Sequence, residues 1–225
     1  MARTYWAAGT AVGLALLFAV GATVATAGGA DSAPAASRTP GLHSADAGFA
    51  RDMAVHHQQA VEMSFIVRDR TKDDAVRSLA YDIANTQANQ RGMLHGWLDM
   101  WGLPKTVADE PPMSWMGTGG ASHGAEGHAM GGVVTKPGAL MPGMATKEDL
   151  AQLGSAEGRD AEVLYLRLMT AHHKGGVAMA QGCADQCANP AERALAQGMV
   201  DAQQSELQLM ADMLKQRGAD PLAAE

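Results

Sequence analysis

Residues 53–63 read MAVHHQQAVEM, and residues 169–179 read MTAHHKGGVAM. Both segments fit the pattern M-x-x-H-H-x-x-x-V-x-M, and they begin 116 residues apart. The same offset continues downstream without a gap, so that Gln87 aligns with Gln203. A register shared over this length indicates an internal duplication, with a repeated unit of about 60 residues.

Each unit has the hydrophobic pattern of two helices. Apolar residues recur at steps of three and four over residues 49–67 and 79–101, and again over 163–179 and 195–213. No segment shows the alternation that is typical of a strand. We therefore predict an all-α fold of two helical hairpins. Because the apolar stripes of the hairpins need a partner, we expect a four-helix bundle with one long crossover.

Residues at the expected helix ends support this prediction. Thr71 with Asp74 three residues on fits a capping box that opens the second helix. Asn189 followed by Pro190 is a strong start for the last helix, since it joins an N-cap to a first-turn proline. Thr146 is expected to cap a short helix that leads into the second unit.

These signals divide the chain into regions. The helical domain is expected to span residues 44–218, followed by a tail at 219–225. Within it, the first hairpin covers 44–102, the crossover 103–146 and the second hairpin 147–218.

The start of the chain predicts export. Residues 1–27 contain an uncharged stretch from position 6 that ends in the small-residue sequence Ala-Thr-Ala, which fits a cleavage signal. Residues 5–27 are also long enough to span a bilayer, so a cleaved signal peptide and a retained membrane anchor both stay open. Residues 28–43 are rich in Ala, Gly, Ser and Pro and predict a flexible linker. In either case we expect the helical domain outside the cytoplasm, periplasmic, secreted or anchored at the cell envelope.

The composition excludes several classes of protein. The 225 residues carry a net charge of −7 and no cluster of Lys or Arg, which argues against a nucleic-acid partner. No Gly-rich phosphate loop, nucleophile elbow or H-E-x-x-H motif is present. The carboxylates expected to face inward, Glu62 and Glu206, are too few for a di-iron site. We therefore predict a protein that is not an enzyme.

Sulfur is the unusual feature of the composition. The chain has 15 Met, more than its 3 Phe, 3 Tyr and 4 Trp together. In each repeat two methionines and a histidine stand at i, i+3 and i+10, near one face of a helix. Thioether and imidazole ligands suit Cu(I), and Cu(II) when more imidazoles take part, so we expect copper, more as Cu(I) than as Cu(II). The alternative for each residue is ordinary core packing. The two faces consist of Met53, His56 and Met63, and of Met169, His172 and Met179.

Other residues near the motifs have expected supporting roles. His57 and His173 lie about 100° further round their helices and need not point the same way. The aligned Gln87 and Gln203, with Glu206, are expected to hydrogen-bond the histidines from neighbouring helices. The alternative is that the two amides are buried and satisfy each other.

The crossover is rich in Gly, Met and His, and loops of this length are usually functional or disordered. Methionine is an odd choice for an exposed spacer, because it gains no packing there and is open to oxidation. We therefore expect accessory contacts to copper, with a flexible spacer as the alternative. The accessory residues are Met113, Met116, His123, His128, Met130, Met141 and Met144. The methionines left for ordinary helix packing are Met93, Met100, Met199, Met210 and Met213.

The two cysteines, Cys183 and Cys187, fall at the expected turn between the last two helices. In an exported protein a short disulfide is the first expectation. A Cu(I) dithiolate and free thiols are the alternatives.

The chain resembles the exported family known as domain of unknown function 305. The resemblance lies in FARDMAVHHQQAVEM at residues 49–63, MPGM at 141–144 and LRLMTAHHKGGVAMA at 166–180, and it covers about residues 44–217. It implies a ferritin-like four-helix bundle and, for members that have been studied, extracytoplasmic copper binding linked to copper resistance. The metal ligands that it implies are Met53, His56, His57, Met63, Met169, His172, His173 and Met179.

Two features depart from the family pattern. Lys174-Gly175-Gly176 places paired glycines in the second motif, where we expect them to loosen the helix. Cys183 and Cys187 are the second departure. Both leave it open whether the two half-sites are equivalent.

Our leading hypothesis is an extracytoplasmic protein that binds copper through the duplicated motifs and buffers it, confers resistance or hands it on. The metal ion is the expected partner, with a second copy of the chain or a copper-transfer protein as further partners. We expect contact with a membrane only through residues 5–27. The alternatives are a copper-dependent oxidase or redox enzyme, and a structural or interaction module without metal. Specific copper binding would raise the melting temperature, which separates it from the last alternative.

Overall fold

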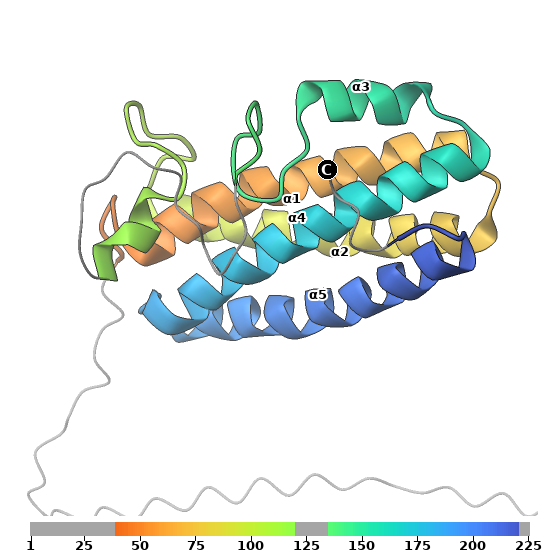
Figure 1. The fold of residues 1–225 in the computed structure, drawn as a ribbon. Helices are drawn as coiled ribbons and strands as arrows, with labels where there is room; N and C mark the ends of the chain where they lie inside the picture. The colour runs from red at the N-terminus through yellow and green to blue at the C-terminus, as the bar shows by residue number, and fades with distance from the viewer. Residues whose placement is uncertain (1–38, 120–134, 221–225) are drawn as a thin grey trace, which may run out of the picture. The chain divides into compact units, whose positions relative to one another are not determined.

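The computed structural model describes residues 39–119 and 135–220 (Figure 1). Within these ranges the chain forms helices and no strand, as the hydrophobic periodicity predicts. Five are α-helices and one is a short 3-10 helix. In chain order they are α1 (Ala45–Arg70), α2 (Asp74–Trp101), η1 (Ser114–Gly119), α3 (Lys147–Ser155), α4 (Gly158–Gln186) and α5 (Pro190–Gln216).

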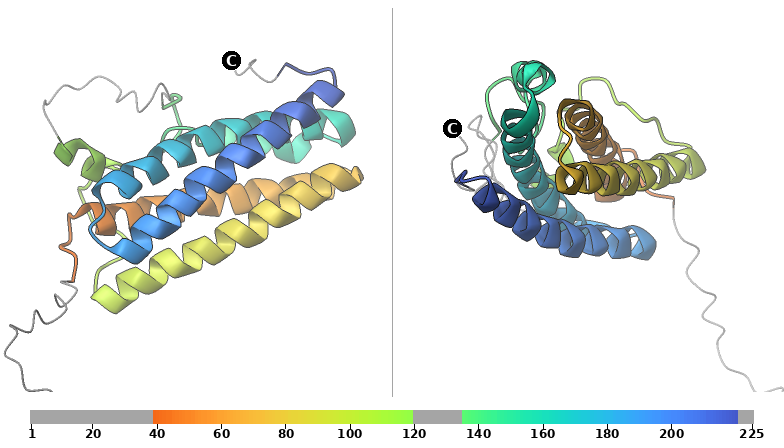
Figure 2. Two further views of the ribbon diagram at one scale, coloured as in Figure 1. Left: turned by 90° about the horizontal axis from the view of Figure 1, so that it is seen from below. Right: turned by 90° about the vertical axis from the view of Figure 1, so that its right-hand side faces the viewer.

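Two helical hairpins, α1–α2 and α4–α5, make up most of the described chain. The two helices of each hairpin pack against each other, and the hairpins meet mainly through α1 and α4. Figure 2 shows α1 and α2 on one side and α4 and α5 on the other. Because α1 and α4 run in opposite directions (Figure 1), the two copies of the duplicated motif cross near their middle.

Two of the predicted helix starts are confirmed. Asn189 is the N-cap of α5, and Pro190 opens its first turn. Thr146 is the N-cap of α3 and forms a capping box with Asp149, in which each side chain accepts a hydrogen bond from the other residue's backbone N–H. The second hairpin therefore begins with the local signals that its sequence carries.

The predicted capping box of Thr71 with Asp74 is wrong. Asp73 is the N-cap of α2, and its carboxylate accepts a hydrogen bond from the backbone N–H of Val76. The hydroxyl of Thr71 instead donates to the buried carboxylate of Glu162 on α4. The Thr71 side chain, which the local pattern assigned to the helix cap, makes a tertiary contact with α4 instead.

Part of the crossover packs into the core, so the alternative of a flexible spacer does not hold for that part. Trp115 of η1 is 2% exposed, and Met141 and Met144 lie among buried side chains of α1 and α4. The carboxylate of Asp52 on α1 ties η1 down, because it accepts hydrogen bonds from the backbone N–H of Met113 and from the indole N–H of Trp115. Core packing therefore explains some of the methionine in this segment.

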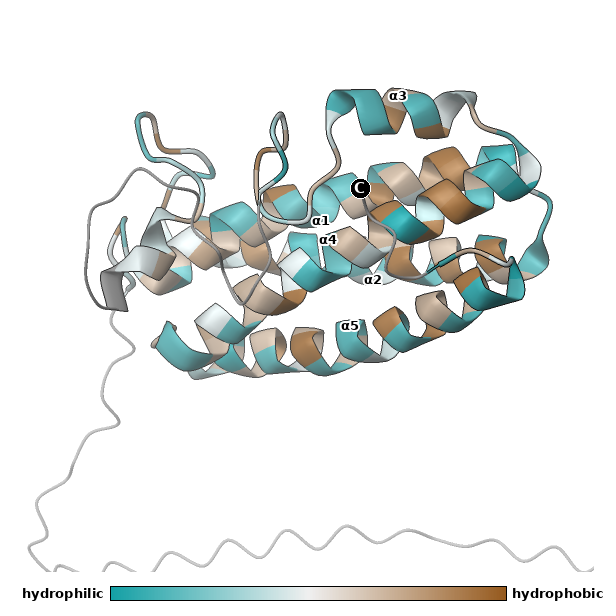
Figure 3. Cartoon of the chain, viewed as in Figure 1, coloured by the Kyte–Doolittle hydropathy of each residue, from teal (hydrophilic) through white to brown (hydrophobic). Residues whose placement is uncertain are grey.

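The buried apolar side chains form two clusters, toward opposite ends of the long helices. One contains Met53 and Met179, and the other contains Met63 and Met169. Hydrophobic and hydrophilic residues share each long helix (Figure 3), as expected for helices that bury only one face. The motif histidines lie between the two clusters along α1 and α4.

Among the described residues, no helix is long and apolar enough to cross a membrane. The leader predicted at residues 1–27 and most of the predicted linker fall outside the described ranges.

Candidate metal centre

His56 and His172 face each other where α1 crosses α4. Their ring centroids are 3.7 Å apart, with 33° between the ring planes. The Nε2 atom of His172 lies 2.9 Å from the backbone carbonyl oxygen of His56. Because a carbonyl oxygen only accepts, His172 carries its proton on Nε2 and leaves the lone pair of Nδ1 without a partner. Both side chains are fully buried.

His57 and His173, one position further along, turn toward the second helix of their own hairpin. The Nε2 atom of His173 is 2.6 Å from a carboxylate oxygen of Glu206 on α5. His57 lies beside Gln87 and Gln90 of α2, close enough for both amides to favour its charged form. Neither amide reaches a ring nitrogen of His57 with hydrogen-bonding geometry. Both histidines are fully buried.

The ring nitrogens of these four histidines are mostly unpaired. Within the part of the chain that the structure describes, six of the eight have no hydrogen-bond partner. Buried polar atoms are nearly always paired, because an unpaired one costs about 1–3 kcal/mol. Unpaired nitrogens of neutral imidazole are donor atoms that a metal ion could use. The six unpaired nitrogens are Nδ1 and Nε2 of His56 and His57, and Nδ1 of His172 and His173.

Burial keeps the imidazoles of His56, His57 and His172 neutral. Desolvation, and then the neighbouring His173, lower the pKa of His56 to about 3. Desolvation, followed by His56, lowers the pKa of His57 to about 3. The pKa of His172 lies well below its usual value for the same two reasons, burial first. Neutral imidazole is the form that binds a metal ion, so no proton has to leave these rings at neutral pH.

The four motif methionines are fully buried, but they do not form one group. Met53 packs in the cluster that holds Met179, and Met63 packs in the cluster that holds Met169. The antiparallel course of α1 and α4 explains the division, since the first methionine of one motif then lies toward the last methionine of the other. The structure thus has a methionine pair on each side of the histidines.

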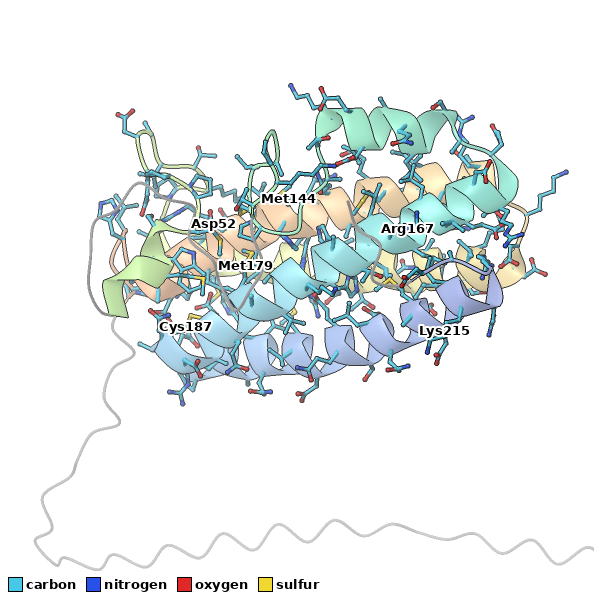
Figure 4. The ribbon with its side chains drawn as sticks, in the orientation of Figure 1. Asp52, Met144, Arg167, Met179, Cys187 and Lys215 are labelled. Atoms are coloured by element: carbon cyan, nitrogen blue, oxygen red, sulfur yellow. A yellow bond between two sulfur atoms is a disulfide. The ribbon has the colours of Figure 1, made fainter. Side chains whose placement is uncertain are left out.

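A short segment of the crossover, residues 141–145, adds two more thioethers to one of these pairs. We call this segment the strap. Met141 is 1% exposed and Met144 is 8% exposed, and both belong to the cluster of Met53 and Met179. Figure 4 marks Met144 and Met179 on the half of the molecule away from Lys215. This half is the richer in sulfur around the motifs.

Two contacts hold the strap against the motifs. The side chain of Gln59 donates to the carbonyl oxygen of Ala145 at 2.9 Å and accepts from the backbone N–H of Ala145 at 2.7 Å. Gly175 of α4 allows the backbone to approach, because a Cβ there would lie 2.7 Å from the carbonyl carbon of Pro142. The Pro142 carbonyl also favours the charged form of His56, against the larger effect of burial.

The paired glycines of the second motif do not loosen the helix, which corrects the sequence prediction. α4 continues through Gly175 and Gly176. Both are buried and allow close contacts: Gly175 faces the strap, and a Cβ on Gly176 would touch the side-chain amide of Gln203. Gln59 and Gly175 occupy equivalent positions of the two repeats, so the same position in each motif holds the strap.

The polar residues predicted around the histidines have different environments. Gln87 is buried with both its amide nitrogen and its amide oxygen unpaired, and Gln203 is buried with its oxygen unpaired. Glu206 contacts His173 directly. Glu62 is exposed, so the prediction that it faces inward is wrong.

The methionines assigned to helix packing divide into two groups. Met199, Met210 and Met213 are buried, as predicted. Met93 is 43% exposed and Met100 is 81% exposed, so the prediction of packing is wrong for these two.

The crossover residues outside the strap are not brought to the histidines. Met113 and Met116 are half-buried, and Met116 packs against Gly182, nine residues beyond His173 on α4. Three further predicted accessory residues lie outside the described ranges: His123, His128 and Met130.

Sequence reasoning missed a buried carboxyl group near the cysteines. Cys183 and Cys187 are joined in a disulfide, and Glu192 of α5 is fully buried beside it. Burial, and then the nearby Asp46, raise the pKa of Glu192 to about 9. In the sequence Glu192 looks like an ordinary acidic residue in the first turn of a helix, so no signal distinguished it.

Ligand atoms of Cys183, Cys187 and Glu192 all lie within 4.8 Å of one another. Within residues 39–119 and 135–220, no other group of three His, Cys, Asp or Glu residues brings its ligand atoms this close together. The described motif histidines therefore do not present three converging nitrogens.

Comparison with known proteins places these observations in a family. The model of the family "Domain of unknown function (DUF305)" matches residues 46–214. A solved DUF305 protein from Streptomyces coelicolor, provisionally described as secreted, is 57% identical to the chain. The match covers 80% of this chain and 98% of that one, with a TM-score of 0.69. The comparison with curated proteins gave no match.

Two other solved structures are more distant. A DUF305 fragment from Deinococcus radiodurans is 28% identical over 79% of this chain and 99% of its own, with a TM-score of 0.60. CopM in its Cu(I)-bound form is 19% identical over 76% of this chain and 96% of its own, with a TM-score of 0.53. CopM has also been solved with Cu(II) and with Ag. At this identity the likeness to CopM concerns the fold alone.

Proposed function

This chain belongs to the DUF305 family, and we propose that it is an exported protein that binds copper, mainly as Cu(I), and buffers it or hands it on without catalytic turnover. The observation that carries the proposal is the group of unpaired ring nitrogens where α1 crosses α4. The four long helices would act as a ferritin-like four-helix bundle that encloses the metal. The uncharged leader at residues 1–27 and the description of the Streptomyces coelicolor relative support export.

The donor atoms favour a soft cation. Each motif supplies neutral imidazole and thioether, which suit Cu(I) better than they suit Mg²⁺, Ca²⁺ or Mn²⁺. Neither donor has to lose a proton on binding, since the thioether has none and burial holds the imidazoles neutral. Three converging nitrogens, which Zn²⁺ often takes, are not assembled among the described histidines.

We infer that the metal lies on the side of the histidines that faces the strap. Met53 and Met179 share a cluster with Met141 and Met144 on that side, so four thioethers are available there. His56 is the nearest imidazole donor by its contacts, because it adjoins the strap and both its ring nitrogens are unpaired. Met63 and Met169, on the opposite side of the histidines, would form a second pair of copper ligands with weaker affinity.

The relatives give further support without fixing the ligands. CopM is described in Cu(I)-, Cu(II)- and Ag-bound forms, and its fold matches over 76–77% of this chain. Cu(I) and Ag(I) share a preference for sulfur, which agrees with the thioethers found here.

A titration of the purified protein with Cu(I), against a chromophoric competing chelator, tests the proposal. We expect saturable binding and a rise in the melting temperature, because a ligand that binds only the folded state stabilises it. Replacing His56, His57, His172 and His173 by Ala should remove most of the binding. If the stoichiometry stays unchanged in that variant, the assignment to the histidines is wrong.

A second pair of variants locates the metal without removing the histidines. Leucine has nearly the volume of methionine and no sulfur, so Met→Leu changes cost little stability in a core. Met53→Leu with Met179→Leu should weaken Cu(I) binding strongly, whereas Met63→Leu with Met169→Leu should weaken it less. The reverse order would place the metal on the other side of the histidines. If the wild-type protein binds no copper and its melting temperature does not respond to copper, the chain is a module without metal.

A further inference from the structure

The end of α4 carries a second cluster of donor atoms, separate from the histidines. Cys183 lies ten residues after His173, which corresponds to about 15 Å along a helix. Cys187 is the C-cap of α4, and Glu192 lies in the first turn of α5. The sulfur atoms and a carboxylate oxygen lie within 4.8 Å of one another. Figure 4 marks Cys187 at the end of its helix.

The carboxyl group of Glu192 is an unusual feature of this cluster. The residue is 0% exposed, and its carboxyl group hydrogen-bonds the side chain of Asp46. The Asp46 carboxylate also accepts hydrogen bonds from the backbone N–H groups of Ala188 and Asn189 in the turn between α4 and α5. Burying two carboxyl groups side by side costs free energy, so their presence next to the cysteines calls for a role.

We propose that Cys183 and Cys187, once reduced, bind a soft monovalent cation such as Cu(I), with Glu192 as a hydrogen-bond donor to one thiolate, and that the disulfide closes this site. The site would depend on redox state and would be independent of the histidines. Thiolates are the ligands that Cu(I) prefers. Two metal–sulfur bonds of about 2.3 Å require the sulfurs to separate to about 4 Å. The Cα atoms are 4.8 Å apart, so side-chain rotation can supply that separation.

A dithiol can serve as the reductant that opens the site. Two electrons pass from the dithiol to the Cys183–Cys187 bond, which breaks to give two protein thiols, while the dithiol becomes a disulfide. When the cation binds, each thiol releases its proton to solvent. Two thiolates and one Cu(I) carry a net charge of −1. The Glu192 carboxyl group lies within 4.8 Å of the two sulfurs, so it is placed to donate an O–H to one thiolate.

Residues of η1 pack near the cysteines. Trp115 belongs to the same buried cluster as Cys183 and Cys187, and Met116 packs against that cluster. Trp115 and Met116 both lie close to Gly182, the residue before Cys183. A Cβ at Gly182 would touch the terminal methyl of Met116 and would lie 3.2 Å from its sulfur. Met116 is half-buried, so its side chain is partly accessible to solvent.

The test compares the oxidised and the reduced full chain in a Cu(I) titration under nitrogen. A phosphine reduces the disulfide with one water molecule, giving two thiols and the phosphine oxide, and is then removed by gel filtration. We expect the reduced protein to bind one equivalent more than the oxidised protein, with new thiolate-to-copper absorption in the ultraviolet. The extra equivalent should disappear in the double variant Cys183→Ser and Cys187→Ser. Equal stoichiometry in both redox states, or an extra equivalent that persists in this variant, would overturn the proposal.

Variants of Glu192 test its part separately. Glu192→Gln keeps a hydrogen-bond donor and should retain the extra equivalent, whereas Glu192→Leu should weaken it by at least tenfold. Loss in both variants would mean that the carboxylate is a ligand, and loss in neither would mean that it has no role. Binding by the oxidised protein reports on the histidine motifs alone. If the oxidised protein binds no copper while the reduced protein binds one equivalent, the proposed function fails and the second site stands.

Discussion

His172 donates its Nε2–H to the backbone carbonyl oxygen of His56, its own counterpart in the other repeat, across 2.9 Å. The reciprocal bond does not exist, because both ring nitrogens of His56 are unpaired. The duplicated motifs therefore meet at their centre without being equivalent there. One histidine is fixed in orientation and the other keeps both of its nitrogens free.

Acid should destabilise the metal-free protein by protonating the buried rings of His56 and His57. The pKa values of His56 and His57 are about 3 in the folded state, because burial opposes their charge. Above pH 6.5 the imidazoles are mostly neutral in both the folded and the unfolded state, so their burial costs no stability through charge. Below pH 6.5 the imidazoles bind protons in the unfolded state but stay neutral in the folded state. The free energy of unfolding should fall by about 1.4 kcal/mol per pH unit for each such histidine, down to about pH 3.

Urea unfolding between pH 4 and pH 7 measures this effect. His57→Gln removes one titrating ring and should make the dependence shallower by that amount. Gln58 is exposed on the same helix, and Gln58→Ala removes no titrating group, so this control should leave the slope unchanged. A wild-type stability that does not vary over this range would show that the histidines are protonated in the folded state.

The sequence predicts the histidine pairs well, because helical periodicity and an unbroken offset of 116 residues place the motifs on two related helices. It does not predict where the methionines gather. Met53 and Met63 are about 15 Å apart along one helix face and so belong to different clusters. The opposite direction of α4 decides that Met179 joins Met53 and that Met169 joins Met63. The direction of crossing is a tertiary property that spacing within one helix does not contain.

The strap escapes prediction for a similar reason. The contact between Gln59 and Ala145 joins residues 86 positions apart, and Gln59 looks like any polar helix residue. Gly175 looks like a helix breaker until the backbone that crosses it is known. Local propensity correctly describes the cost of such a glycine and gives no hint of what the glycine permits.

Removing the Gln59 contact should release the strap. Gln59→Leu keeps the size of the side chain and leaves the buried N–H and C=O of Ala145 unpaired. We expect a loss of about 2–4 kcal/mol in the free energy of unfolding, together with faster release of Cu(I). Gln58 is exposed on the same helix, so Gln58→Leu should change stability by less than about 0.5 kcal/mol. Equal effects of the two changes would mean that the strap is not held by Gln59.

Two glycine substitutions on the second hairpin should have opposite effects on the free energy of unfolding. Gly175→Ala brings a methyl group against the carbonyl group of Pro142 and within 3.2 Å of Gly143. Overpacking of this kind costs about 1–3 kcal/mol, and it should also weaken copper binding because the strap has to move. Gly198→Ala on α5 meets nothing within 4 Å and should stabilise the helix by about 1 kcal/mol. Thermal unfolding of the two variants decides the matter, and a stabilising Gly175→Ala would contradict the close approach of the strap.

The carboxylate of Glu206 distinguishes the second half-site from the first, where Gln90 occupies the equivalent position. A carboxylate that accepts the Nε2–H of His173 fixes the proton there and makes Nδ1 a better donor to a metal. Glu206→Gln should therefore lower Cu(I) affinity by about 10- to 100-fold with little change in the melting temperature of the metal-free protein.

Gln90→Glu provides the reciprocal test, because it gives His57 the acidic neighbour that His173 already has. It should raise the affinity of the first half-site, as measured by competition with a Cu(I) chelator. If Glu206→Gln binds copper as tightly as the wild type does, then His173 is not a ligand that depends on its carboxylate. In that case the hydrogen bond to Glu206 serves only to satisfy a buried ring.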